Sequence, residues 1–324
     1  MKSKGLVFLA VVLLLLSAQA GFAQEDVSKY PSKPITYICP SPPGLATDTS
    51  IRLLAKELEK ILGQPVVVVN KPGAALTIGT AAVATAKPDG YTIGFTGGPP
   101  LYFTPLLQKV PYDPFKDLRM VAQYGGCTNG AVFVKGDSPF KSFKDVIAYA
   151  RQNPKKVTYG TTGANSITHI TLEAIAKQEN VQLTHIPFKG TPEAQSAVLG
   201  GHVSFAAGDF VVDMVGSGQI KLLMMLREDK SEYHPEIPIL KDLGYNIPYA
   251  VLGVVMTQKS VPDPIVRKLE EAVVKAMKEP AFVKGMKDLR LQLTYRSGKE
   301  MDAYNLKSNE YYTKVFKEMG LLIK

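Results

Sequence analysis

Two stretches of this chain share a pattern that suits the binding of a small anion. Each runs from an apolar strand into a loop of small and hydroxyl residues and then into an amphipathic helix; they are Ile35 to Leu58 and Val157 to Ile175. The first N–H groups of a helix have no partner inside it and carry a partial positive charge. Two such helix starts, one from each half of the chain, could hold one anion between them. The pattern therefore predicts a binding cleft.

The two loops contain no full cation, because neither Pro40 to Ser50 nor Tyr159 to His169 includes a lysine or an arginine. An anion there would rely on backbone N–H groups and hydroxyl donors, which bind without catalysing. The predicted ligand-binding residues lie in these loops and at three further strand ends. They are Gly44, Leu45, Ala46, Thr47, Asp48, Ala74, Ala75, Thr161, Thr162, Gly163, Ala164, Asn165, Ser166, His169, Lys189 and Asp209.

Several of these residues also have a purely structural interpretation. Asp48, Thr47 and Ser166 open helices, where such side chains commonly act as caps or interact with the helix dipole. His169 could equally be a buried structural histidine, and Lys189 an ordinary exposed lysine. For Asp209, a local hydrogen bond is the alternative to lining the cleft.

The amino terminus has the form of a secretory signal. Lys2 and Lys4 precede an apolar run from Leu6 to Leu16, and small residues up to Ala23 then suit a signal peptidase. We expect residues 1–23 to be removed and the mature chain to be soluble and periplasmic. Residues 1–23 carry two lysines and no acidic residue, so their loss lowers the formal charge from +9 to +7. This excess suits an anionic ligand, but it is too dispersed to indicate a nucleic-acid surface.

The sequence offers little support for an enzyme, a metal site or a cofactor. It has no GxSxG, HExxH, P-loop or dinucleotide-binding motif in a suitable context. His169, His185, His202 and His234 lack ligand spacing, and Ser166 with His169 lacks an orienting acid. Cys39 and Cys127 could form a disulfide in an oxidising compartment or remain buried thiols.

Short apolar strands alternate with amphipathic helices, which is typical of an α/β protein with largely parallel sheets. We expect a helix from Thr49 to Leu62 that buries Ile51, Leu54, Ala55, Leu58, Ile61 and Leu62, and a capping box at Ser142. Thr191 is predicted to cap a helix, and two helices should close the chain after a return strand. The expected strands are Ile35–Cys39, Pro65–Val69, Tyr91–Phe95, Val157–Tyr159, Leu183–Pro187, Val203–Ala207, Ile220–Met225 and Leu252–Met256.

A series of short motifs resembles the substrate-binding proteins of tripartite tricarboxylate transporters, the TctC-like or Bug-type receptors. The motifs follow in order along the mature chain; they are Tyr30-Pro31-Ser32-Lys33-Pro34-Ile35, Pro42-Pro43-Gly44, Gly63-Gln64-Pro65-Val66-Val67-Val68, Asn70-Lys71-Pro72-Gly73-Ala74, Ile78-Gly79, Lys87-Pro88-Asp89-Gly90-Tyr91-Thr92, Pro111-Tyr112-Asp113-Pro114, Ser166 with His169, and His185-Ile186-Pro187-Phe188-Lys189-Gly190.

This resemblance implies a two-lobed periplasmic binding protein of type II, a venus flytrap with a central cleft and hinge crossovers. Lobe 1 would comprise residues 24–124 and 250–324, and lobe 2 residues 125–249. The family holds a carboxylate between its two strand-to-helix loops, through amides, hydroxyls and waters, and presents it to membrane permease subunits. The implied ligand is a dicarboxylate, a tricarboxylate or an aromatic acid, and the protein would be a monomer. A ligand sensor for a membrane kinase, or a hydrolase, is the alternative.

The sequence departs from the family pattern at three glycine positions. Gly44-Leu45 and Ala74-Ala75 stand where two small flexible residues are usual, and Ala164-Asn165 replaces another glycine. Added side chains would narrow the cleft or give it an apolar wall. The departures therefore favour a ligand with an apolar or aromatic body.

Overall fold

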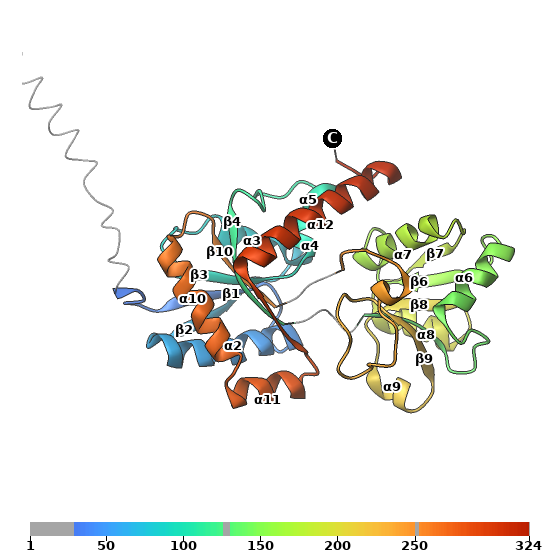
Figure 1. Cartoon of the computed structure of the whole chain (residues 1–324), viewed down its shortest axis with the longest axis horizontal. Helices are drawn as coiled ribbons and strands as arrows, with labels where there is room; N and C mark the ends of the chain where they lie inside the picture. The colour runs from blue at the N-terminus through green and yellow to red at the C-terminus, as the bar shows by residue number, and fades with distance from the viewer. Residues whose placement is uncertain (1–28, 126–129, 250–252, 324) are drawn as a thin grey trace, which may run out of the picture.

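The computed structural model describes residues 29–125, 130–249 and 253–323, and these residues form two bodies that lie side by side (Figure 1). Each body is built around one sheet, so the predicted α/β two-lobed architecture is confirmed. The signal-peptide prediction falls on residues outside the described ranges, as does Cys127. Cys39 is a buried free thiol.

The first sheet takes strands from both ends of the chain. Its order is β11-β4-β10-β3-β1-β2. The strands are β1 (Ile35–Cys39), β2 (Val66–Asn70), β3 (Thr92–Thr96), β4 (Leu118–Gly125), β10 (Val254–Gln258) and β11 (Leu293–Ser297).

The second sheet takes all its strands from the middle of the chain. Its order is β7-β6-β8-β5-β9. The strands are β5 (Ala131–Lys135), β6 (Thr158–Thr161), β7 (Thr184–Pro187), β8 (Phe205–Gly208) and β9 (Ile220–Met225). Most strands lie within two residues of the predicted limits, but Leu252, the predicted start of the return strand, is outside the described residues.

Both sheets are mixed, whereas the sequence pattern predicted largely parallel ones. β5 is antiparallel to β8 and β9, and β10 is antiparallel to β3 and β4. The reason is the crossover between bodies. β5 and β10 are the first strands after the chain passes from one body to the other. β5 enters at the edge where β6, β7, β8 and β9 end, and β10 enters at the edge where β1 to β4 end; β11 is likewise antiparallel to β4.

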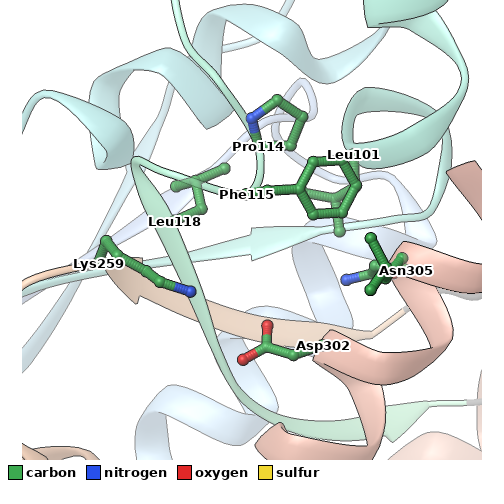
Figure 2. A pocket seen from close by; sticks show the side chains of 8 residues that line it. Leu101, Pro114, Phe115, Leu118, Lys259, Asp302 and Asn305 are labelled. Carbon is green, nitrogen blue, oxygen red and sulfur yellow. The ribbon is translucent and has the colours of Figure 1, made fainter.

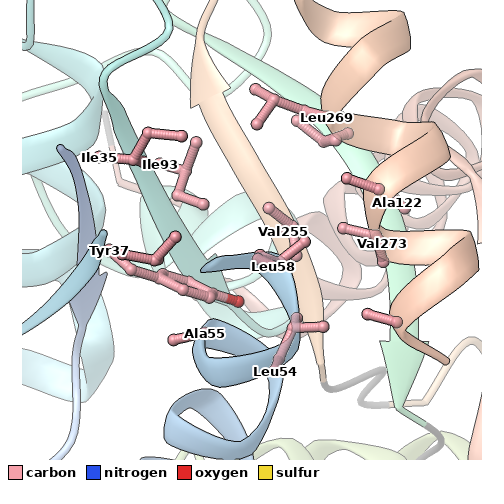
Figure 3. Packing of buried hydrophobic residues seen from close by; sticks show 14 of the residues in the cluster. Ile35, Tyr37, Leu54, Ala55, Leu58, Ile93, Ala122, Val255, Leu269 and Val273 are labelled. Atoms are coloured by element: carbon pink, nitrogen blue, oxygen red, sulfur yellow. The ribbon is translucent and has the colours of Figure 1, made fainter. Parts of the chain in front are cut away.

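Helices cover both faces of the first sheet. α2 (Ala46–Leu62), α10 (Asp263–Ala276) and α11 (Pro280–Asp288) pack on one face. Leu54 and Leu58 of α2 meet Leu269 and Val273 of α10 over the strands in Figure 3. The other face is covered by α3 (Thr77–Ala84), α4 (Pro99–Tyr102), α5 (Thr104–Leu107) and α12 (Gly298–Met319).

The predicted apolar face of the first helix is confirmed. Ile51, Leu54, Ala55 and Leu58 are buried, and Ile61 and Leu62 are half-buried. The helix begins at Ala46, three residues before the predicted start, because its first turn carries no apolar residue larger than this alanine to mark the periodicity.

Within the described residues, the second body has four α-helices and one short 3-10 helix around its sheet. These are α6 (Phe143–Gln152), α7 (Ile167–Gln178), α8 (Thr191–Leu199), α9 (Val212–Gly216) and the 3-10 helix Leu240–Leu243, together with residues 226–249 that lead back. The capping box of α6 is present, since Ser142 Oγ accepts from Asp145 N (3.2 Å) and Asp145 Oδ2 accepts from Ser142 N (2.9 Å).

Two details of the helices differ from the prediction. The cap of α8 is Gly190, and Thr191 is the first helical residue and makes no side-chain cap. The chain also ends in three helices, α10, α11 and α12, with β11 before the last. The residues of β11 are half-buried or exposed at the edge of the sheet, so they lack the continuous apolar run that marks a central strand.

The last helix ties the two bodies together. Tyr304 of α12 donates to the carboxylate of Glu228 and to the carbonyl oxygen of Tyr249 (3.1 Å). Further along α12, Glu318 pairs with Lys177 of α7. The last helix therefore contacts both bodies in this structure. None of the described helices is both long and apolar enough to cross a bilayer.

Candidate functional site

Parallel strands place most of the predicted site residues at one edge of each sheet. β1, β2 and β3 run in the same direction, and so does β4, because β10 is antiparallel to both β3 and β4. In the second sheet β6, β7 and β8 are parallel, and β9 shares their direction because β5 is antiparallel to β8 and β9. Ligands of open α/β sheets bind outside such carboxyl ends.

The two carboxyl edges lie close to each other because the chain crosses between them. β4 ends at Gly125 on the first edge, and β5 begins at Ala131 on the second, paired with the last residues of β8 and β9. Six residue steps span at most about 20 Å. The return passes the same point, where Tyr124 N donates to Gly253 O (2.8 Å). The loops that follow β1 and β6 are therefore carried on neighbouring edges.

The first loop keeps its helix start uncapped. Leu45 is the N-cap residue of α2 and makes no side-chain bond, and Gly44 has a φ of +85° that suits glycine. Gly44, Leu45 and Ala46 are exposed and Thr47 is half-buried. The first N–H groups of α2 therefore face solvent and are available to an anion.

Asp48 stabilises this loop through hydrogen bonds of its side chain. Its side chain is buried, and its carboxylate accepts from Gly44 N (2.9 Å), Arg52 Nε (2.9 Å) and Asn70 Nδ2 (2.7 Å). Burial alone would raise the pKa of Asp48, but the bonds from Arg52, Asn70 and Gly44 outweigh it and lower the pKa to about 2. The carboxylate is thus ionised and already accepts hydrogen bonds from three donors, which favours the structural interpretation of this residue.

The loop after β2 has a strained backbone. Gly73, Ala74, Ala75 and Leu76 all have positive φ, at +119°, +45°, +51° and +71°. Each non-glycine residue in this left-handed region costs roughly 1–2 kcal/mol. Ala74 and Ala75 are exposed, and Asn70, the last residue of the strand, bonds Ser41 O in the neighbouring loop (2.9 Å). The two loops of this edge are therefore joined, and the strain lies where the sequence has alanine in place of glycine.

The second loop is capped by its own side chains. Ser166 Oγ accepts from His169 N (3.2 Å), and His169 Nδ1 accepts from Asn165 N (3.0 Å), so the two residues hold each other and the turn between them. Gly163 and Asn165 have φ of +134° and +57°. Burial lowers the pKa of His169, and Glu173 opposes this. His169 thus holds the turn through its ring nitrogen, and the Ser166 hydroxyl acts as an acceptor in this cap.

His185 supports the second loop and was missed from the sequence. Its ring stacks on His169 at 3.9 Å between centroids, and its Nε2 lies 2.8 Å from Thr161 Oγ1, which also donates to Gly163 O (3.1 Å). Burial and the neighbouring His169 lower the pKa of His185 to about 4. Thr161 is fully buried, so its side chain serves the loop, while Thr162, Ala164 and Asn165 are exposed.

Two further predicted residues sit on adjacent strand ends of the second sheet. A side-chain carbon added at Gly208 would lie 3.9 Å from Thr162, which brings the loop after β8, and with it Asp209, beside the second loop. Asp209 is exposed, yet the protein around it raises its pKa through desolvation. This combination is typical of a side chain on a concave surface. Lys189, after β7, is exposed, and its backbone N–H donates to Glu193.

A third loop at the first edge was also missed. Thr96 is the last residue of β3, and Gly97 and Gly98 follow it; all three are buried, and Thr96 Oγ1 donates to Gly97 O (3.1 Å). The sequence contained a signal for this loop, because an apolar strand followed by two glycines repeats the strand-to-small-residue pattern of the other loops. Within the described residues, no group of histidine, cysteine, aspartate and glutamate could hold a metal ion.

Comparison with known proteins identifies the family. The model of the tripartite tricarboxylate transporter family receptor, TctC, matches residues 50–321. The chain belongs to this receptor family. A protein encoded upstream of the gbd region of Cupriavidus necator is 35% identical over 96% of this chain and 94% of its own length. BugT of Bordetella pertussis is 31% identical over 85% of this chain and 86% of its own length.

The fold comparison agrees with the family. A TctC solute-binding protein from Polaromonas, solved without ligand, superposes with a TM-score of 0.80 at 27% identity, over 89% of this chain and 99% of the other. These relatives are solute-binding receptors. The chain is accordingly a binding protein and not an enzyme, as its motifs predicted.

Proposed function

We propose that this TctC-family receptor captures a small organic carboxylate between the loops after β1 and β6 and delivers it to a tripartite tricarboxylate-type permease. The observation that supports the ligand class is the uncapped start of α2 at a strand edge that neighbours the Ser166 loop. Arg52, the cation that contacts Asp48 of the first loop, is already paired with that carboxylate. Amides and hydroxyls remain as the donors, and they suit a carboxylate.

We further propose that lobe 1 comprises residues 24–124 and 250–324 and lobe 2 residues 125–249, and that the lobes close on the ligand. The first sheet takes its strands from residues 35–125 and 254–297 and the second from residues 131–225, which supports this division. Residues 1–23 would direct export to the periplasm, where the mature monomer meets the permease. Transport is favoured over sensing because the family is defined by its transporter.

The exposed Leu45 supports a ligand with an apolar or aromatic body. Its side chain is 53% exposed at the very start of α2, beside the free N–H groups. A carboxylate at those groups would place the rest of its body against this leucine. Aromatic and longer aliphatic acids should therefore bind more tightly than short acids with the same charge.

A ligand panel tests the proposal. The mature protein is heated with aromatic acids, dicarboxylates, tricarboxylates, sugars and amines, and the shift in melting temperature is measured. A ligand present at 100 times its Kd stabilises the folded state by about 2.7 kcal/mol. Hits confined to carboxylates, with one site per chain by calorimetry, are expected. Hits only among sugars or amines would overturn the ligand class.

A further inference from the structure

The first body contains a cavity on the edge of the sheet opposite to the loops described above. It lies where β4 begins and where β10 ends, at Leu118 and Lys259, beneath one face of α12. Its volume is about 230 Å³, which is below the range of pockets for drug-sized ligands. Five apolar and three polar residues line it; they are Leu101, Pro114, Phe115, Leu118, Leu306, Lys259, Asp302 and Asn305.

The three polar side chains converge on the cavity. Figure 2 shows the Lys259 ammonium, the Asp302 carboxylate and the Asn305 amide nitrogen all directed to the space below the ring of Phe115. Lys259 directly follows the end of β10, and Asp302 and Asn305 lie on one face of α12. No salt bridge joins Lys259 to Asp302 among the described residues, so two opposite charges face the same space without meeting.

Asn305 is the polar group that the rest of the protein does not explain. Its side chain is 4% exposed, and its Oδ1 is buried with no hydrogen-bond partner among the described residues. Buried amides are nearly always bonded. This oxygen is closed to the cavity as well, and Figure 2 shows that it is the amide nitrogen, a donor, that a bound molecule could reach.

Asp302 is likewise only partly satisfied. One oxygen accepts a long bond from Met120 N (3.4 Å). Burial raises the pKa of Asp302, and Lys259 and Arg119 oppose this; Arg119 itself is paired with Asp263. A cationic donor entering the cavity could therefore donate a hydrogen bond to the Asp302 carboxylate.

We propose that this cavity binds a small zwitterion with an apolar side chain, of the neutral amino acid class. The ammonium of the ligand bonds Asp302, its carboxylate bonds Lys259 and the Asn305 amide, and its side chain packs on Phe115, Leu118 and Leu101. Both charges are needed, because the cavity offers one acceptor and one cation at separate positions. This second site is independent of the proposed carboxylate site, since it lies at the other edge of the sheet.

Calorimetry with leucine, valine and methionine tests the proposal on the purified mature protein. Binding of at least one of them, with one site per chain, is expected. Isocaproate and isopentylamine, which keep the leucine skeleton but carry only one charge each, should bind at least about tenfold more weakly. Equal binding of either single-charge analogue would overturn the zwitterion, and no binding of any amino acid up to about 10 mM would overturn the site.

Variants assign the binding to this cavity. Lys259→Gln and Asp302→Asn should each weaken amino acid binding at least about tenfold. Lys299→Gln, which removes an exposed lysine of α12 outside the cavity, should leave the binding unchanged. Lys259 is exposed, so its variant tests the proposal even where Asp302→Asn fails to fold. Ser166→Phe must leave amino acid binding intact; loss there, with retention in Asp302→Asn, would place the amino acid between the lobes and overturn the proposal.

Discussion

The loops that follow β1 and β6 are held by opposite means. The loop after β1 rests on a buried ionised carboxylate, Asp48, which leaves the start of α2 uncapped. The loop after β6 is held by neutral groups, the Ser166 hydroxyl and the His169 ring. The first loop therefore supplies free backbone donors, and the second supplies a side-chain hydroxyl. The difference also predicts that acid acts first on the second loop, because its histidines titrate at higher pH than Asp48.

The largest expected effect is on binding at the second loop. Ser166→Phe places a bulky ring at the start of α7 and removes the hydroxyl, so the affinity for the carboxylate found in the ligand panel should fall at least about 100-fold. The free energy of unfolding should fall by only about 1 kcal/mol, which is the contribution of the lost N-cap hydrogen bond. Calorimetry measures the affinity and urea unfolding the stability. Unchanged affinity would remove this loop from the site.

The first loop should respond in stability more than the second. Asp48→Ala leaves Gly44 N, Arg52 and Asn70 without their acceptor, and the free energy of unfolding should fall by about 2–3 kcal/mol. Since the folded pKa is lowered to about 2, this contribution is present above pH 4 and is lost as pH falls toward 2. Urea unfolding at pH 7 measures it. Asp213→Asn, in the exposed part of α9, serves as the control with little expected change.

The second loop should weaken at mildly acid pH. The folded pKa values of His169 and His185 are lowered, so the unfolded chain binds more protons. Their contribution is complete above about pH 6.5 and is lost as pH falls toward 4, by about 1–2 kcal/mol in total after allowance for partial exposure. Urea unfolding between pH 7 and pH 4 measures the loss. His185→Gln keeps a donor to Thr161 and should flatten the profile; an unchanged slope would show that other groups cause it.

The smallest effect concerns the strain after β2. Ala75→Gly removes the penalty of a side chain at φ +51°, but it also makes the unfolded chain more flexible. The net result should be a stabilisation of about 0.5 kcal/mol. Ala82→Gly in α3, where the backbone is helical, should instead destabilise by about 0.5–1 kcal/mol. Thermal unfolding of both variants compares them, and destabilisation by both would contradict the strain.

Much of the fold could be predicted because it rests on local patterns. The buried face of α2, the capping box at Ser142 and most strand positions follow from periodicity and from side chains close in sequence. Mixed strand directions, the strand β11 and the third terminal helix were missed, since they depend on contacts between residues far apart. Thr191 was misassigned because the cap is decided by backbone geometry at Gly190.

The candidate site was predictable in location but not in the role of each residue. The sequence by itself determined which strands end in small, hydroxyl-rich loops without cations, because that property belongs to consecutive residues. Only the tertiary structure decided that Asp48 is consumed by Arg52 and Asn70, that His185 lies on His169, and that Asn305 faces a cavity. Each of these facts depends on which distant side chains meet, and a hydrogen-bond partner or a desolvated charge exists only after the chain has folded.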